Sequence, residues 1–488
     1  MGVSRRTFLQ GSLAGGVALR SAGSARSQGA VPTDSDLPYL SIVQASELMR
    51  TKQLSPLELI QAVLKRIDAV EPRVQAFNTI ARDEALRAAR VAEQEIMSGR
   101  YRGPLHGIPV GFKDTHYTRG IETTAGSPQL EGFIPTYDAT VVARLKEAGA
   151  ILVGKTRLPA FSMGGNTPSH NPWDLSRTPG GSSGGSAVAL AAGELMGATG
   201  GDTSNSIRHP ATLCNVVGMK ATFGLVSRYG VIPISWTLDH IGPMTRSVED
   251  NALMLNVLAG HDPLDDYTVE VNIPDYTRGL RGGVRGLRIG IPKDPLIDDF
   301  HPECRRAFEE ALEVYRKLGA RVAEVEMPST LQAMDSGQRV IRICEAGSYH
   351  EYHLAHHADR YGASSRPRSE AEVGALIPAV EYLRAQKLRK IFLKESHQMF
   401  RSLDVFITPG RPAPAGEPLQ FRVRQDFAKM FNCNGFPALA LPAGFSTSPP
   451  GLPVGLQIAA KPFEEEIIYR AAFAYESETS WHLKRPNL

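Results

Sequence analysis

The chain has 488 residues, of which 42% are hydrophobic and 22% charged, as in ordinary globular proteins, and it is long enough for one large α/β domain or two to three average ones. Its formal charge of +3 is small for this length, so the composition points to neither nucleic acid nor an anionic membrane as a partner. Its four cysteines lack a CxxC spacing, which argues against a disulfide framework and against a cysteine-built zinc site.

The first 30 residues have the pattern of an export signal. The segment SRRTFLQ at 4–10 is followed by a short apolar run over 11–19 and by small residues around 22–25, too short for a membrane anchor. Paired arginines before Phe-Leu resemble a twin-arginine signal, although a basic disordered tail is an alternative. We therefore expect a periplasmic or secreted protein, with the twin-arginine export machinery as a partner of its precursor.

The mature chain, 31–488, reads as one α/β unit. Apolar residues at helical spacing predict an N-terminal helical layer over 36–100. Short apolar runs separated by glycine, proline and serine turns predict buried strands of a core over 105–295 and 400–488. The polar helical interval 300–400 interrupts these strands, so we expect it to be a variable cap that forms part of the substrate pocket.

The segment GAILVGKT at 149–156 matches the phosphate-binding expression GxxxxGK[ST]. Such a loop must follow a strand and precede a helix. Here Ile-Leu-Val is itself the strand, and Leu158 and Pro159 follow where the helix would begin. We interpret the segment as a buried strand.

The segment GGSSG at 180–184 matches GxSxG, the nucleophile elbow of α/β hydrolases. An elbow needs an apolar strand directly before it, whereas a turn-rich segment with two prolines precedes this one. A glycine-rich loop that approaches a ligand remains the better interpretation.

Three histidines, His350, His353 and His357, share one face of a predicted helix. A histidine-rich surface or lid helix is the commoner explanation, and metal binding is the alternative. We predict no metal site.

Lysine and serine residues in three segments fit hydrolytic chemistry. Lys113 ends the apolar run 108–112, and serines occupy both the glycine-rich segment 179–186 and GDTSNSIRHP at 201–210. A serine hydroxyl is a weak nucleophile until a base takes its proton, and a lysine kept neutral by burial is such a base. A second serine could pass the proton along, and glycine-rich loops could direct N–H groups at an oxyanion.

Long motifs in order along the chain then identify the family. They are GIPVGFKD at 107–114, TTAGS at 123–127, NPWDLSRTPGGSSGGSA at 171–187, GMKATFGLVSRYG at 218–230, LDHIGPMTRSVED at 238–250 and GFPALALPAGF at 435–445. With them the sequence resembles the amidase signature family of serine hydrolases. The resemblance implies a single α/β domain with a central mixed, twisted sheet covered by helices on both faces. It also implies hydrolysis of carboxylic amides, and possible activity on aryl esters or carbamates, through an acyl-enzyme without metal or cofactor.

Carried over by position, the family's catalytic residues fall on Lys113 as the base, Ser182 as the bridging serine on a cis peptide, and Ser206 as the nucleophile. The resemblance further implies an oxyanion hole made by the backbone N–H groups of Thr203, Ser204, Asn205 and Ser206. We expect Ser183, Asp202 and Arg208 to support these loops.

The chain departs from the family at Ser204 and Asn205, where Gly-Gly is usual. Asparagine tolerates a positive φ better than serine does, so the loop can be kept with a changed width. An unusual substrate is one consequence, and a neutral variation within the family is the other.

The substrate pocket is expected in the helical interval and in the loop 161–166, with Met163, Gly164 and Gly165 as substrate-binding residues. Six aromatic and apolar residues of the interval could line a hydrophobic pocket or form the core of the cap: Tyr349, Tyr352, Tyr361, Leu376, Ile377 and Tyr382.

The expected partner of the mature chain is a small amide substrate, with no nucleic acid or membrane, and the chain is expected to be a monomer or homodimer. The alternative is the amidase subunit of a glutamyl-tRNA amidotransferase complex that releases ammonia from glutamine, against which the predicted export signal argues. A binding protein on an inactive hydrolase scaffold is a third possibility, disfavoured because all three triad positions are kept.

Overall fold

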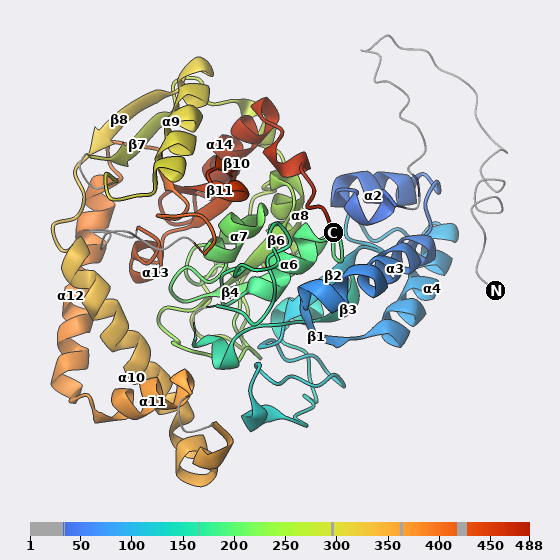
Figure 1. The fold of residues 1–488 in the computed structure, drawn as a ribbon, viewed down its shortest axis with the longest axis horizontal. Helices are drawn as coiled ribbons and strands as arrows, with labels where there is room; N and C mark the ends of the chain where they lie inside the picture. The colour runs from blue at the N-terminus through green and yellow to red at the C-terminus, as the bar shows by residue number, and fades with distance from the viewer. Residues whose placement is uncertain (1–32, 34, 165, 294–296, 362–364, 417–426) are drawn as a thin grey trace.

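A computed structural model of the chain describes residues 33, 35–164, 166–293, 297–361, 365–416 and 427–488 (Figure 1). The predicted export signal over 1–30 lies outside these residues. Among the helices of the described part, none combines the length and the apolar character needed to cross a bilayer.

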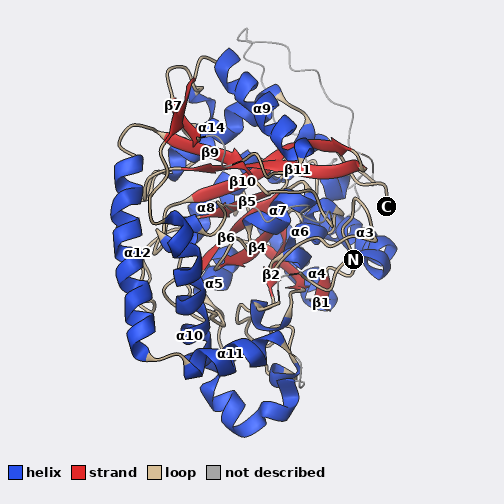
Figure 2. Cartoon of the chain, turned by 60° about the vertical axis from the view of Figure 1, so that its left-hand side comes forward, coloured by secondary structure: helices blue, strands red, loops and turns tan. Residues whose placement is uncertain are grey.

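Strands from both halves of the chain join in one sheet (Figure 2). They are β1 (Phe77–Ile80), β2 (Pro109–Lys113), β3 (Ile151–Thr156), β4 (Gly197–Asp202), β5 (Val217–Lys220), β6 (His240–Thr245), β7 (Arg288–Pro292), β8 (Arg321–Val325), β9 (Val405–Pro409), β10 (Ala438–Thr447) and β11 (Pro450–Ala459). Their order across the sheet is β1-β3-β2-β4-β6-β5-β10-β11-β9-β7-β8. Strand β2 runs parallel to β3 and β4, whereas β6, β5, β10 and β11 follow one another in antiparallel pairs, so the sheet is mixed.

Helices pack on both faces of this sheet (Figures 1 and 2). They are α2 (Ile42–Arg50), α3 (Pro56–Val74), α4 (Arg82–Met97), α5 (Thr140–Glu147), α6 (Gly184–Ala191), α7 (Arg208–Cys214), α8 (Val248–Leu258), α9 (Pro302–Lys317), α10 (Leu331–His357), α11 (Arg366–Leu376), α12 (Ala379–Met399), α13 (Met430–Cys433) and α14 (Glu465–Glu478). The predicted fold class, a single α/β domain with a helix-covered mixed sheet, is confirmed.

Local sequence explains where the N-terminal layer begins its longest helix. Ser55 caps α3, its Oγ accepting from Leu57 N at 3.0 Å, and Pro56 occupies the first helical position, where a missing N–H costs nothing. Apolar residues then recur every three or four positions along α3 and are buried against the sheet.

The interval 300–400 has two parts in the structure. Helix α9 and strand β8 belong to the α/β core, because β8 pairs in parallel with β7 at the edge of the sheet. Helices α11 and α12 instead both pack on α10, and the three lie beside the sheet (Figure 2). The name cap is used below for these three helices.

The GxxxxGK[ST] match lies in the core. Residues 151–156 form β3, and the buried Lys155 Nζ lies 3.1 Å from Asp114 Oδ1 while donating to Thr123 Oγ1 at 2.6 Å. Lys155 therefore balances the buried carboxylate of Asp114, which follows Lys113 directly in the chain.

One of the three histidines on the predicted face of α10 lies in the protein interior. His350 is fully buried, its Nδ1 is 2.6 Å from Tyr361 Oη, and its ring packs against Phe161 with centroids 4.5 Å apart. Burial lowers the pKa of His350 to about 4, so this side chain is a neutral part of an aromatic core.

Candidate active site

Lys113 is the last residue of β2, and its side chain is 1% exposed. Burial disfavours the charged ammonium and lowers the pKa of Lys113 to about 7, although the carboxylates of Asp239 and Asp202 act in the opposite direction. An amine with such a pKa is available as a base near neutral pH.

Ser182 lies in the glycine-rich loop that leads into α6, and the Gly181–Ser182 peptide bond is cis. Lys113 Nζ lies 2.7 Å from Ser182 Oγ, within hydrogen-bonding distance. The lysine and the first serine, 69 positions apart in the chain, are thus brought into direct contact by β2 and the start of α6.

Ser206 lies in the turn between β4 and α7. Ser183 N donates to Ser206 O at 3.0 Å, which joins the loops of the two predicted catalytic serines. Ser206 Oγ makes no hydrogen bond with any residue that the structure describes, so its contact with Ser182 Oγ is not formed in this conformation. Such contacts are often long in enzymes without substrate.

The backbone N–H groups of residues 203–206, called here the nucleophile loop, do not all have a hydrogen-bond acceptor. Asn205 N donates to Asp202 Oδ1 at 2.8 Å. The N–H groups of Thr203, Ser204 and Ser206 donate to nothing within the described ranges. Of the four predicted oxyanion donors, these three are available to a substrate, whereas that of Asn205 is occupied.

Asp202 and Arg208 form a buried ion pair beneath this loop. Arg208 Nε and Nη2 donate to Asp202 Oδ2 and Oδ1, both at 3.1 Å, and each residue is 1% exposed. Although burial alone would raise it, the Arg208 guanidinium holds the pKa of Asp202 well below its usual range. The carboxylate also accepts from Ile207 N at 3.1 Å, so the pair fixes the start of α7.

Ser183 supports β4 directly. Its Oγ accepts from Gly201 N at 3.1 Å and donates to Gly201 O at 3.2 Å. This double contact holds the glycine-rich loop against the strand that carries the nucleophile loop.

The predicted substrate-binding residues separate in the structure. Met163 is buried in an apolar cluster with Phe161, Ile232 and Ile234, whereas Gly164 is exposed, and Gly165 lies outside the described residues. A cavity of about 20 Å³ beside Lys113 is lined by the two isoleucines, among others. The apolar cluster therefore reaches the cavity beside Lys113.

The six aromatic and apolar residues of the cap also divide. Tyr349 and Tyr361 pack on Phe161, with ring centroids 6.5 and 5.9 Å apart, and so border that cluster. Tyr352 and Leu376 are 63% and 81% exposed on the outside of the cap. Ile377 is half-buried, and Tyr382 Oη donates to Glu345 Oε1 at 2.8 Å between two cap helices.

Two residues near the site were not predicted as functional. Asp239 accepts from Thr203 Oγ1 at 2.6 Å and also from Ile234 N at 2.8 Å, and it lies within the quoted segment LDHIGPMTRSVED. Gln338 of α10 contacts Ser204 and Thr203, but it lies in no motif, and only the folded structure brings it to the loop.

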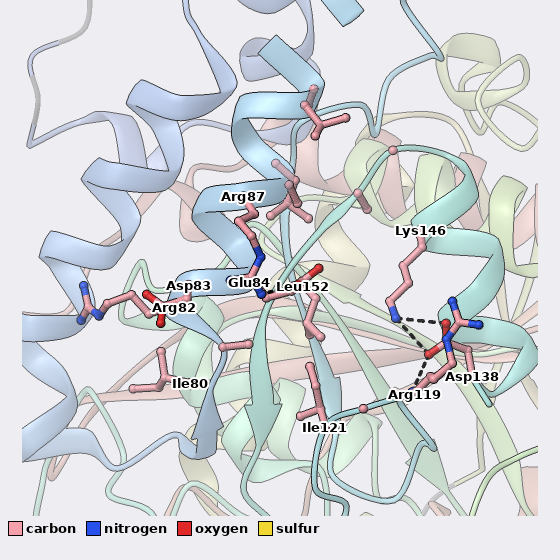
Figure 3. A pocket seen from close by; sticks show the side chains of 18 of the residues that line it. Ile80, Arg82, Asp83, Glu84, Arg87, Arg119, Ile121, Asp138, Lys146 and Leu152 are labelled. Carbon is pink, nitrogen blue, oxygen red and sulfur yellow. Dashed lines mark hydrogen bonds and ion pairs between the residues drawn. The ribbon is translucent and has the colours of Figure 1, made fainter. Parts of the chain in front are cut away.

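A hollow of about 910 Å³ lies elsewhere, between α4 and the segment that leads to α5 (Figure 3). Two pairs of its charged lining residues bind each other, with Lys146 Nζ 2.9 Å from Asp138 Oδ1 and Arg87 Nη2 2.6 Å from Glu84 Oε2. It shares no lining residue with the cavity at Lys113.

Comparison with known proteins agrees with this geometry. Residues 58–468 match the family described as Amidase. A glutamyl-tRNA(Gln) amidotransferase subunit of Geobacter sp. (strain M21) is 40% identical over 484 residues, covering 92% of this chain and 99% of the relative.

Solved structures show the same similarity. The corresponding glutamyl-tRNA(Gln) amidotransferase subunit of Thermotoga maritima has a TM-score of 0.76 at 33% identity, covering 91% of this chain and 96% of that one. The native peptide amidase of Stenotrophomonas maltophilia has a TM-score of 0.80 at 33% identity, covering 92% and 99%.

These relatives contradict the predicted location and partners. Several are named as a subunit of an enzyme of glutamyl-tRNA(Gln), and tRNA is charged in the cytoplasm, so the prediction of a periplasmic or secreted protein is wrong. The twin-arginine signal, inferred from a short basic and apolar pattern, and the export machinery as a partner are withdrawn with it. The expected monomer or homodimer without nucleic acid also conflicts with relatives named as one subunit of a tRNA-linked enzyme.

The family match covers most of the chain, and both kinds of relative share its fold over nearly their whole length. The chain belongs to the amidase signature family, whose enzymes hydrolyse the carbon–nitrogen bonds of amides.

Proposed function

We propose that this enzyme hydrolyses amides through an acyl-enzyme on Ser206, with Ser182 as proton relay and Lys113 as base. The observation that carries the proposal is the 2.7 Å contact between a buried Lys113, with its pKa near 7, and Ser182 Oγ. A neutral amine at this place can take a proton from a serine, and the adjacent loop presents the second serine.

The proposed steps balance as follows. Ser206 Oγ forms a bond to the amide carbon while its proton passes to Ser182 Oγ, and the Ser182 proton passes to Lys113 Nζ. The protons then return by the same route to the amide nitrogen, the C–N bond breaks, and the amine or ammonia leaves. Water then attacks the ester carbon with the same proton transfers, which releases the carboxylic acid and restores Ser206.

The oxyanion of each tetrahedral intermediate needs preorganised donors. We assign this role to the N–H groups of Thr203, Ser204 and Ser206, which have no acceptor among the described residues. The N–H of Asn205 is assigned to the Asp202 carboxylate instead.

Support for the substrate class comes from the apolar cluster beside the site. Phe161, Met163, Ile232 and Ile234 would favour an apolar or aromatic group next to the amide carbonyl. We propose Met163 as a contact of that group and Gly164 as part of the loop that borders it.

A second candidate is release of ammonia from glutamine within an amidotransferase complex. It is favoured by the 40% identity to relatives named as a glutamyl-tRNA(Gln) amidotransferase subunit, which extends over nearly their full length. The same three side chains would act, and only the amide and the destination of ammonia would differ.

One set of assays tests both candidates. The purified chain is treated with a fluorophosphonate, and the labelled peptide is identified by mass spectrometry. Label on Ser206, lost in Ser206→Ala but kept in Ser204→Ala, supports the proposed nucleophile, and label on Ser204 would refute it.

Product formation is then measured with aryl anilides, aliphatic amides and L-glutamine. Anilide or aliphatic amide hydrolysis by the chain alone favours a free-standing amidase. Ammonia release from L-glutamine only after the other subunits of a bacterial glutamyl-tRNA amidotransferase are added favours the second candidate.

A further inference from the structure

A side chain of the cap, that of Gln338, contacts the nucleophile loop. Gln338 lies on α10 and is 2% exposed. Its Nε2 donates to Ser204 Oγ at 2.6 Å and to Thr203 O at 3.3 Å. Both acceptors belong to the loop that carries the proposed oxyanion donors.

The contact with Thr203 O bears on catalysis because a peptide unit is planar. Thr203 C=O and Ser204 N–H belong to the same unit and point in opposite directions. A donor that fixes the carbonyl therefore also fixes the direction of the N–H, and it polarises the unit so that the N–H becomes a stronger donor.

Thr203 is also held through its side chain. Thr203 Oγ1 donates to Asp239 Oδ1 at 2.6 Å, and Asp239 Oδ2 accepts from Ile234 N and Ser235 N at 2.8 and 3.0 Å. Gln338 and Asp239 thus both hold Thr203, the first through its carbonyl oxygen and the second through its hydroxyl.

The shorter contact depends on the side chain of Ser204. A glycine at this position would have no hydroxyl, so Ser204 itself supplies the acceptor that Gln338 binds at 2.6 Å. Ser204 therefore has a buried partner on the cap.

We propose that Gln338 is a positioning residue that orients the Ser204 N–H toward the oxyanion through Ser204 Oγ and Thr203 O. The proposal rests on the proposed function of Ser206. Gln338 acts through the loop and is not itself a catalytic residue.

Other contacts hold α10 in place when Gln338 is changed. Glu345, also on α10, accepts from Thr237 Oγ1 at 2.7 Å and from Tyr382 Oη at 2.8 Å, and also from Ser235 Oγ. Replacement of Gln338 by methionine, which has nearly the same length and no donor, is therefore expected to leave the cap folded.

The test is the pH 8 inactivation of the full chain by a fluorophosphonate, which forms a tetrahedral adduct on the nucleophile. For Gln338→Met we expect a maximal inactivation rate lower by about tenfold or more, with half-saturation within threefold of wild type. Ser204→Ala removes the acceptor from the other side and is expected to give a similar loss. The double variant is expected to be no slower than the slower single variant, because both single changes remove the contact between Gln338 Nε2 and Ser204 Oγ.

Gln386→Met is the matched control. Gln386 is a half-buried glutamine of α12 that donates to Tyr382 Oη at 2.9 Å and does not contact the loop. The maximal inactivation rate of Gln386→Met is therefore expected to stay within twofold of wild type. A Gln338→Met rate equal to wild type, a change confined to half-saturation, or an equal loss in Gln386→Met would each overturn the proposal. Absence of label on wild-type Ser206 would instead overturn the proposed function.

Discussion

Lys113 Nζ and Ser182 Oγ lie 2.7 Å apart, in a place where the lysine is almost fully shielded from water. The carboxylate that follows it in the chain, Asp114, is paired with Lys155 at 3.1 Å and so is neutralised locally. Burial then outweighs the more distant carboxylates, and the pKa of Lys113 falls to about 7. The arrangement leaves a large fraction of this amine neutral at physiological pH.

This lowered pKa has a consequence for stability. Between the ordinary lysine value of 10.5 and about 7, the unfolded chain binds a proton at Lys113 that the folded chain does not. The free energy of unfolding should therefore fall as pH falls through that window and become level below it. Lys113→Met lacks this dependence and should be more stable than wild type by about 4 kcal/mol near pH 7.

Urea denaturation at pH 7.5, 8.5 and 9.5 measures the effect. The advantage of Lys113→Met is expected to shrink by about 1.4 kcal/mol per pH unit as pH rises. Lys293→Met, at an exposed lysine paired with Glu326, is the control and should show no such trend. A pH-independent difference between wild type and Lys113→Met would contradict the shifted pKa.

The Asp202–Arg208 pair is expected to be important for stability. Arg208→Met leaves a buried carboxylate without its cation and removes the donors to Gln457 Oε1 and Ala428 O, so a loss of about 3–5 kcal/mol is predicted. Arg50→Met breaks an exposed pair with Glu47, which solvent screens, and should leave the free energy of unfolding nearly unchanged. Urea unfolding of both variants measures the two changes in the free energy of unfolding. Similar losses would contradict a larger contribution of the buried pair.

Asn205 combines two unfavourable features. Its φ is +93°, and its buried side-chain amide has no partner among the described residues. Asn205→Gly removes both and should be at least as stable as wild type, whereas Asn205→Ala keeps the unfavourable φ and should be less stable than the glycine variant by about 1 kcal/mol.

Asn215→Gly is a matched control for this comparison. Asn215 also has a positive φ, but its Nδ2 donates to Trp481 O at 2.8 Å, so the change to glycine should cost about 1 kcal/mol. Thermal unfolding ranks the variants. An unfolding temperature of Asn205→Ala that equals or exceeds that of Asn205→Gly would contradict the argument.

The sequence predicted the fold class because strand and helix periodicity is local, and the GxxxxGK[ST] match was rejected because its apolar centre is β3. It also pointed to Lys113, since a lysine at the end of an apolar strand is buried with it. It could not predict Gln338, whose contact with Ser204 spans 134 positions, nor that Asn205 N–H is occupied by Asp202. Export was inferred from a short basic segment, a pattern too weak to stand against relatives that match nearly the whole chain.

The most direct test of the account is the pH dependence of fluorophosphonate inactivation between about pH 5.5 and 9. Wild type should gain about tenfold in rate per pH unit below about 7 and level off above it, because only neutral Lys113 accepts the proton. Lys113→Arg, which stays charged, should be slow at every pH. A wild-type rate that does not change over this range, or an arginine variant as fast as wild type, would contradict the assignment of Lys113 as the base.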